Sequence, residues 1–389
     1  MISIKFIREN TELINESLIN RNSEVDLDLI LELDTSRRAI ITSVEALKSD
    51  RNYYSKEIAK YKQKGQDCNS EIKNMQKVSN AIKEYDLSLK EINEKLNNLL
   101  LFIPNIPHES VPKGKTEKDN IVIREWGEKP NIHFLEKDHV FLSEKHNLVD
   151  FKRGAKISGS GYPMYIDRGA RLERALINYM MDYHSANNFT EVFPPFLVNE
   201  SSVLTTGQLP KFKDDMYYIN KDDMYCISTA EVPITNMHRD EVLNKENLPI
   251  QYAAYSACFR REAGSYGKDT KGLLRLHQFN KVELVKFSNP FNSYEELELL
   301  LSSAEKILQD LNLHYRVIEL CTGDLSFSAA KCYDIEVWSP AEGKYLEVSS
   351  CSNFESFQSV RGNIRYKKDG KLEYVHTLNA SGLATPRLF

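Results

Sequence analysis

Residues 72–99, IKNMQKVSNAIKEYDLSLKEINEKLNNL, carry an uninterrupted seven-residue repeat of apolar side chains. The repeat positions alternate in steps of three and four, and they are Met75, Val78, Ile82, Tyr85, Leu89, Ile92, Leu96 and Leu99. Such a sustained pattern is typical of a helix that packs one seam against a partner helix. It therefore predicts a long helix that needs a second one.

A weaker repeat precedes it over residues 27–64. One series runs through Ile30, Arg37, Val44, Arg51 and Ile58, and the other through Leu33, Ile40, Leu47, Tyr54 and Tyr61. Residues 64–70 contain Gly, Asp, Asn and Ser, which favour a turn followed by a helix N-cap. Two seams joined by a short turn predict an antiparallel helical hairpin. At about 1.5 Å per residue, a helix over 27–64 would be roughly 57 Å long.

The periodicity by itself favours a coiled coil used for dimerisation or for binding a partner protein. Near the predicted tip, however, basic and aromatic residues are interleaved: Arg51, Tyr53, Tyr54, Lys56, Lys60, Tyr61, Lys62 and Lys64. Basic side chains suit a phosphate backbone, and aromatic rings can pack on exposed sugars or bases. A basic run on a helix is also a common solvated face, so both interpretations remain open at this point.

Prolines at 104, 107 and 112 end the helical pattern. We therefore predict an arm over residues 1–103, a linker over 104–120 and a second domain over 121–389. Amphipathic helices are predicted at about 168–187 and 293–312. Short β-rich runs lie at 121–123, 216–219, 225–227, 252–259, 282–287, 315–319, 332–337 and 345–350. Strands grouped with few intervening helices indicate an α+β fold with a largely antiparallel sheet.

Composition and charge bound the function without fixing it. The net charge of −5 neither indicates nor excludes a nucleic-acid partner, because binding depends on where the basic residues lie. No stretch approaches 18 consecutive apolar residues, and the first residues lack the features of a secretory signal. The six cysteines include no CxxC pair and are expected to be reduced, mostly buried thiols. We expect a cytoplasmic protein.

A chemical motif follows the apolar run 253–258. Residues 259–264 read FRREAG, and residues 274–279, LRLHQF, open the next predicted strand. A strand, a polar loop and a returning strand would place Arg260, Arg261 and Phe279 near one site. Arginine forks suit phosphate or carboxylate oxygens, and a phenylalanine ring can stack on a purine. The chain contains neither GxGxxG nor a P-loop, so a nucleotide would be held in another way.

These segments resemble class II aminoacyl-tRNA synthetases, and within that class the seryl-tRNA synthetase family. Residues 259–264 and 275–283 resemble motif 2, residues 189–195 motif 1, and residues 378–384 with Arg387 motif 3. Residues 105–112, 169–176, 206–212 and 228–233 resemble the seryl branch. The resemblance runs in order along the whole chain. It implies an antiparallel catalytic domain flanked by helices, with the hairpin as a tRNA-binding arm.

The resemblance also implies an activity and its partners. The family activates serine with ATP to seryl-adenylate and transfers the seryl group to the 3′ end of tRNA(Ser), with tRNA(Sec) as a second acceptor. Mg²⁺ is the implied metal, and a homodimer through the motif 1 region is the implied assembly. The reaction would need no covalent enzyme intermediate, because positioning and neutralisation of phosphate charge suffice.

Roles carry over residue by residue. Thr229 and Glu231 would receive the serine ammonium group, and Glu283 would accept from the serine hydroxyl. Ser381 and Asn379 complete the implied serine set. Arg260 and Arg387 are the implied catalytic residues, on the α- and γ-phosphates. The implied ATP contacts are Arg260, Arg261, Glu262, Phe279, Glu347, Val348, Ser349, Ser350 and Arg387, with Glu347 and Ser350 as the metal ligands.

The sequence departs from the family pattern in a few places. Asn280 stands where an acidic residue is frequent, Ala380 where Gly is common, and Thr385-Pro386 where Val-Gly is frequent. A proline is acceptable near a helix start. The family continues beyond Phe389 through a long helix, so we expect either a fragment of a longer protein, which we favour, or a protein that ends early and is impaired. A synthetase-like enzyme serving another acceptor and a non-catalytic interaction protein are the rival hypotheses.

Overall fold

The computed structural model describes residues 1–263 and 271–389, so Gly264 at the end of the arginine motif lies outside the described residues. The chain divides into two compact units. One comprises residues 2–18 and 23–103, and the other comprises Met1, residues 19–22 and residues 104–389. No described helix is both long enough and apolar enough to cross a membrane.

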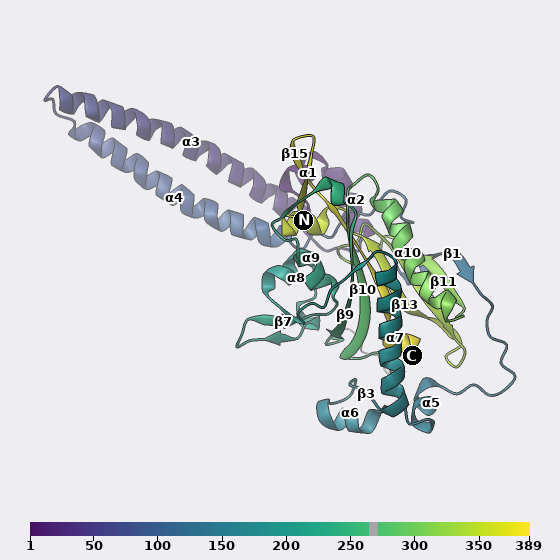
Figure 1. The fold of residues 1–389 in the computed structure, drawn as a ribbon. Helices are drawn as coiled ribbons and strands as arrows, with labels where there is room; N and C mark the ends of the chain where they lie inside the picture. Colours follow the sequence, from purple (N-terminus) through teal and green to yellow (C-terminus); the bar gives the residue numbers. More distant parts are fainter. Residues whose placement is uncertain (264–270) are drawn as a thin grey trace. The chain divides into compact units, whose positions relative to one another are not determined.

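The first unit is built around the predicted helical hairpin. Two short helices, α1 (Ile4–Glu9) and α2 (Thr11–Asn20), precede α3 (Leu27–Gln63) and α4 (Asn69–Leu100), which run antiparallel (Figure 1). Ile82 and Leu96 of the repeat are buried, whereas Tyr85 is 38% exposed and lies outside the packed seam. The predicted side-chain N-cap of the second helix is wrong: α4 starts after Cys68 without a side-chain capping bond.

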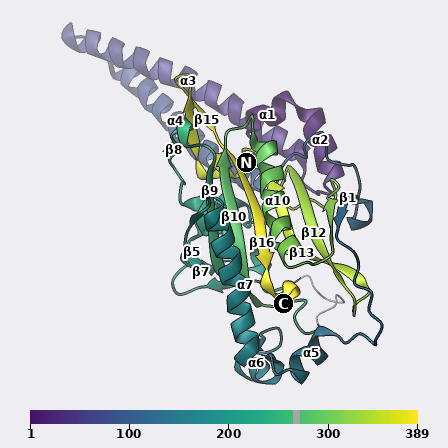
Figure 2. The ribbon, with the colours of Figure 1, turned by 45° about the vertical axis from the view of Figure 1, so that its right-hand side comes forward.

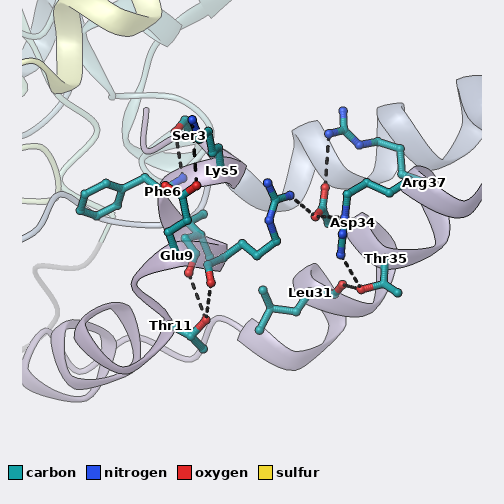
Figure 3. A network of polar contacts seen from close by, with 12 residues as sticks. Ser3, Lys5, Phe6, Glu9, Thr11, Leu31, Asp34, Thr35 and Arg37 are labelled. Carbon is teal, nitrogen blue, oxygen red and sulfur yellow. Dashed lines mark hydrogen bonds and ion pairs between the residues drawn. The ribbon is translucent and has the colours of Figure 1, made fainter. Parts of the chain in front are cut away.

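A buried carboxylate fixes the base of the hairpin. Asp34 of α3 is 1% exposed. Its carboxylate accepts hydrogen bonds from the guanidinium groups of Arg8 at 2.8 Å, Arg38 at 3.0 Å and Arg37 at 3.2 Å (Figure 3). Burial would raise the pKa of Asp34, but the Arg8 hydrogen bond and the three guanidinium charges outweigh burial and lower the pKa. The ion-pair cluster thus ties α1 to α3 and keeps Asp34 charged.

The second unit contains an eight-stranded sheet in the order β1-β11-β12-β13-β16-β10-β9-β4 (Figure 2). All neighbouring pairs are antiparallel except β4–β9. The strands are β1 (Ile121–Trp126), β4 (Thr190–Glu191), β9 (Ile250–Phe259), β10 (Gln278–Ser288), β11 (Tyr315–Glu319), β12 (Lys331–Ser339), β13 (Lys344–Asn353) and β16 (His376–Ala384). The predicted largely antiparallel α+β fold is confirmed. The sequence patterns did not predict β16, which lies in the middle of the sheet.

Alternation along the strands separates two faces of the sheet. Val282 and Leu284 of β10 join Leu378 and Ala380 of β16 in the main core, which the long helices α7 (Asp167–Ala186) and α10 (Ser293–Asp310) cover. Val285 and Phe287 belong to a second apolar cluster with residues of α9 (Glu231–Asn236). Odd-numbered positions of β10 therefore face away from α7 and α10, whereas Leu383 of β16, beyond the register shift with β10, packs in the main core.

Shorter elements complete the second unit. The helices are α5 (His139–Lys145), α6 (Phe151–Ser158), α8 (Glu200–Thr206), α11 (Phe357–Gly362) and α12 (Thr385–Leu388), with Pro386 in the first turn of α12 as expected. The strands are β2 (Val149–Asp150), β3 (Met164–Tyr165), β5 (Leu197–Val198), β6 (Tyr218–Ile219), β7 (Met224–Cys226), β8 (Val242–Leu243), β14 (Arg365–Lys368) and β15 (Lys371–Tyr374). Short 3₁₀ turns lie at Glu117–Asp119, Lys213–Asp215 and Lys245–Asn247.

Residues 104–120 are grouped with this unit. The buried Asn105 donates from its amide to the carbonyls of Ser328 at 2.9 Å and Phe354 at 2.8 Å. Arg21 donates to the carbonyls of Ser326 at 2.6 Å and Ala329 at 3.0 Å. Both side chains therefore hold segments that line a cavity in this unit.

Candidate active site

A cavity of about 540 Å³ lies over the middle strands of the sheet. Most of the predicted site residues line it: Thr229, Glu231, Arg260, Glu262, Phe279, Glu347, Val348, Ser350, Asn379, Ser381 and Arg387. They come from β10, β13, β16, α9 and the segment before it, α12 and the segment after β9. Elements far apart in the sequence thus converge on one site.

Strand geometry explains part of this convergence. Phe279, Lys281 and Glu283 alternate along β10, and Asn379 and Ser381 do so along β16. Side chains two residues apart share a face of a sheet. Glu283 pairs directly with Ser381 across the two strands. An irregularity in register opposite Ile335 and Glu336 lets successive residues 347 and 348 of β13 both reach the cavity.

Two buried carboxylates dominate one end of the site. Asn379 Nδ2 donates to Glu231 Oε2 at 3.1 Å and to Glu283 Oε1 at 2.8 Å. Glu283 is fully buried, and its Oε2 lies 2.6 Å from Lys281 Nζ. Burial, followed by the charge of Glu283, raises the pKa of Glu231 to about 7. Asn379 Oδ1 has no hydrogen-bond partner among the described residues.

Gln358 supports Glu231 from behind. It is fully buried in α11 and donates from Nε2 to Glu231 Oε1 at 2.6 Å. Its own Oε1 accepts from Thr377 Oγ1 at 2.8 Å, which fixes the orientation of the amide. Since an ionised carboxylate only accepts hydrogen bonds, these donors hold Glu231 as an acceptor facing the cavity.

Arginine side chains and an aromatic ring line the rest of the cavity, and the charge of Arg260 also reaches Glu231, where it lowers the pKa of that carboxyl. The Arg260 guanidinium carbon lies 5.1 Å from the centre of the Phe279 ring. Arg275 donates to Glu262 at 3.2 Å. Arg387 Nη1 donates to the carbonyl of Glu347 at 2.6 Å and lies 3.6 Å from its carboxylate. The described residues thus bring three guanidinium groups and an aromatic ring into one cavity lining, which suits an anionic ligand with a planar group.

The predicted metal ligands lie beside a second acidic group, Asp334. Glu347 and Ser350 both line the cavity, and Asp334 lies across from Ser350 on β12. Burial, then the charge of Glu347, raises the pKa of Asp334 well above its ordinary range. No cluster of three His, Cys, Asp or Glu ligands occurs among the described residues. Carboxylate and hydroxyl oxygens without a closed protein cage fit Mg²⁺ bound together with substrate phosphates.

Three predicted site residues do not line the cavity. Glu283 lies beneath it, behind Asn379 and Lys281. Ser349 is buried and donates to the Ser381 carbonyl at 2.6 Å. The Arg261 guanidinium lies over the Tyr217 ring, with the carbon 5.6 Å from the ring centre. The individual roles of all the predicted site residues remain predictions.

The sequence reasoning missed several cavity residues. Lys281, Arg275, Ser328 and Asp215 line the site, and Gln358 supports it. A lysine two residues before Glu283 on one strand was a usable signal for a buried pair, because both side chains share a face. Gln358 lies in a separate helix, and nothing in its local sequence indicates a contact with Glu231.

The fold and the cavity define the core of a class II aminoacyl-tRNA synthetase. Residues 212–389 match the family model described as the tRNA synthetase class II core domain (G, H, P, S and T). Residues 1–107 match the model of the seryl-tRNA synthetase N-terminal domain.

Within that class, the chain belongs to the seryl-tRNA synthetase family, as the sequence predicted. It is 54% identical over 396 residues to a serine–tRNA ligase of Chloroherpeton thalassium, covering 100% of this chain and 93% of the relative. The corresponding protein of Geobacter sulfurreducens is 52% identical over 390 residues, with coverage of 100% and 92%. Seryl-tRNA synthetase of Pyrococcus horikoshii, solved as a complex with ATP, has a TM-score of 0.94 at 39% identity, covering 100% of this chain and 92% of that one.

Proposed function

We propose that this protein is a serine–tRNA ligase that forms seryl-adenylate from serine and ATP and then esterifies the 3′ end of tRNA(Ser). The observation that carries the proposal is the cavity itself. It has a paired-carboxylate end bridged by Asn379 and a cationic end built from Arg260, Phe279 and Arg387. Each end suits one substrate.

The carboxylate end supports serine binding. The ionised carboxylate of Glu231 is the natural partner of an ammonium group, with Thr229 beside it on the same wall. Glu283 would accept from the serine hydroxyl, near Ser381. A buried acceptor that expects a hydroxyl disfavours alanine, because the acceptor would be left unpaired.

The cationic end supports ATP binding and the chemistry. Arg260 would contact the α-phosphate, Phe279 the adenine and Arg387 the γ-phosphate. One carboxylate oxygen of serine attacks the α-phosphorus as the bond to the bridging oxygen of pyrophosphate breaks. In the second step a terminal ribose hydroxyl of tRNA attacks the seryl carbonyl, its proton is lost, and AMP leaves. The protein contributes positioning and charge neutralisation.

Mg²⁺ is the proposed metal, held by Glu347 and Ser350. When bound together with ATP, it would neutralise phosphate charge. The contact of Arg387 with Glu347 supports a shared role for these two residues at the triphosphate.

The hairpin is the proposed tRNA-binding arm. Lys56, Lys60, Lys62 and Lys64 near its turn are all exposed, and Tyr53 is 61% exposed. The match of residues 1–107 to the seryl-tRNA synthetase N-terminal domain supports this role. We further propose tRNA(Sec) as a second substrate, a homodimer through the motif 1 region and a cytoplasmic location.

Two assays on the full chain test the proposal. Serine-dependent exchange of pyrophosphate into ATP reports adenylate formation, and charging of tRNA(Ser) reports the complete reaction. Replacing the four arm lysines with glutamate should remove most charging and leave exchange unchanged, because phosphate contacts supply much of the affinity. A matched variant replaces Lys118, Lys221, Lys245 and Lys371, which are exposed in the other unit, and should retain both activities.

The outcomes separate the hypotheses. Absence of serine-dependent exchange would refute the proposed enzyme. Exchange without charging of tRNA(Ser) by the unmodified chain would favour an enzyme that serves another acceptor. Loss of charging in both lysine variants alike would refute a specific role for the arm.

A further inference from the structure

Glu173 is a buried carboxylate that the proposed reaction does not use. It belongs to α7, on the opposite side of β10 from the cavity, and is 5% exposed. Its Oε1 accepts from Asn280 Nδ2 at 2.8 Å and also from the hydroxyl of Thr385. A single carboxylate oxygen thus joins β10 to the first residue of α12.

These two partners are adjacent to proposed ATP-binding residues. Asn280 directly follows Phe279, and Thr385 is two residues before Arg387. The Thr385 hydroxyl also lies 3.2 Å from the Asn280 carbonyl, and Tyr255 donates to Asn280 Oδ1 at 3.1 Å. Thr385 is fully buried. Because Asn280 and Phe279 alternate on the strand, one faces Glu173 while the other faces the cavity.

We propose that Glu173 is a positioning residue for the nucleotide end of the site, holding Phe279 and Arg387 in register through Asn280 and Thr385. The inference rests on the proposed ATP contacts of those two residues. It also explains why asparagine and threonine suit positions 280 and 385 in this chain. Each supplies a donor to Glu173, whereas an aspartate or a valine would supply none.

Because Glu173 is buried, its carboxylate depends on the hydrogen bonds from Asn280 and Thr385. Burial raises the pKa of Glu173, and the hydrogen bonds from Thr385 and Asn280 oppose that rise. Glu173 Oε2 has no hydrogen-bond partner among the described residues, so Oε1 makes the polar contacts that fix the side chain. Removing either donor would leave Glu173 Oε1 with one hydrogen bond fewer in a buried site, which destabilises this arrangement.

The test is pyrophosphate exchange on full-length variants, with KM measured separately for ATP and serine. Glu173→Ala and Thr385→Val should each raise the KM for ATP by about tenfold or more, because small displacements of positioning groups have large effects. The KM for serine should remain within about twofold, since these hydrogen bonds among Glu173, Asn280 and Thr385 include none of the proposed serine contacts. Thr385→Ser keeps the hydroxyl and should restore ATP binding.

Asn280→Asp gives a sharper result. It installs the acidic residue that is frequent in the family, yet beside a buried Glu173 it replaces a donor by a second carboxylate. Like charges in a buried site disfavour each other, so this variant should resemble Glu173→Ala in its KM for ATP.

A control separates positioning from general stability. Glu305 is equally buried and accepts from Arg124 at 2.9 Å and from Tyr315 at 2.9 Å, away from the cavity. Glu305→Ala should lower the melting temperature without changing the KM for ATP. If the Glu173 and Thr385 variants behave like Glu305→Ala, the positioning role is refuted. If Arg387→Ala also leaves ATP use intact, the proposed ATP contact has failed instead.

Discussion

Glu231 and Glu283 are joined by one amide nitrogen, Asn379 Nδ2, at 3.1 and 2.8 Å. Two buried carboxylates that share a donor repel each other, and the charge of Glu283 contributes to the raised pKa of Glu231. This arrangement is costly for the empty protein. In the proposed function, the serine ammonium group would offset the charge of Glu231 and the serine hydroxyl would donate to Glu283.

Asn379→Ala removes the shared donor. We expect the KM for serine in pyrophosphate exchange to rise by about tenfold or more, because a lost hydrogen bond to a charged group is worth roughly 1.5–3 kcal/mol. The KM for ATP should change little. Asn353 is a fully buried asparagine on the adjacent strand β13 and does not line the cavity. If Asn353→Ala raises the KM for serine as strongly, the effect of Asn379→Ala does not come specifically from its hydrogen bonds to the two carboxylates.

Serine affinity should depend on pH through Glu231. Its pKa in the folded protein is about 7, raised first by burial and then by Glu283, while Lys281, Arg260 and the Gln358 hydrogen bond oppose the rise. Below this pH the free protein holds a proton that an ammonium ligand must displace. The KM for serine should therefore fall by about tenfold in all as pH rises from 6 to 8, since the ionised fraction of a group with a pKa of about 7 rises from roughly 9% to roughly 91% over that range. A KM that is flat across this range would contradict the assignment.

The same pKa shift predicts the sign of a stability change. Because the folded pKa lies above the ordinary value of 4.5, the folded state binds this proton more tightly than the unfolded chain. The stabilisation is complete below pH 4.5 and is lost as pH rises through about 7. Saturating serine should therefore raise the melting temperature more at pH 8 than at pH 6. The opposite order would refute the linkage.

Lys281 provides a stability prediction with a control on the same strand. Lys281→Met leaves the fully buried Glu283 without its cation, and breaking a buried pair costs about 3–5 kcal/mol. Lys286 is 3% exposed and pairs with Glu296 at 2.7 Å on the other face of β10. Denaturant unfolding should show losses in both variants, but only Lys281→Met should raise the KM for serine. If the KM for serine is the same in the Lys281 and Lys286 variants, Lys281 contributes to stability and not to serine binding.

The sequence predicted the parts of this fold that carry strong local periodicity. The hairpin follows from its seven-residue repeat, and β9 to β13 follow from apolar runs bounded by turns. The central strand β16 reads HTLNASGLA, in which small and polar residues outnumber large apolar ones. Its burial comes from the flanking strands β10 and β13 rather than from its own side chains. Local pattern therefore could not predict it.

The candidate site also contains residues that the sequence could identify and residues that it could not. Arg260 and Phe279 were expected near one site from the pattern of two strands joined by a polar loop, and the resemblance to a known family added Glu231. Gln358 and Glu173 were not, because each acts through a contact made by tertiary packing. A buried glutamate within a helical repeat of polar and apolar residues cannot be distinguished from a solvated one until its partners are placed. Supporting residues are therefore harder to predict than the groups they support.

The metal assignment can be tested within one strand pair. Glu347→Gln removes the proposed carboxylate ligand while keeping its shape, so the Mg²⁺ concentration for half-maximal exchange should rise by about tenfold or more. Glu336 is the cross-strand neighbour of Glu347 and does not line the cavity. Its carboxylate accepts a hydrogen bond from Arg316 Nε at 2.5 Å. Glu336→Gln should leave the Mg²⁺ dependence unchanged. If the Mg²⁺ requirement shifts equally in both variants, the effect comes from the total negative charge on β12 and β13. Glu347 would then not be a metal ligand.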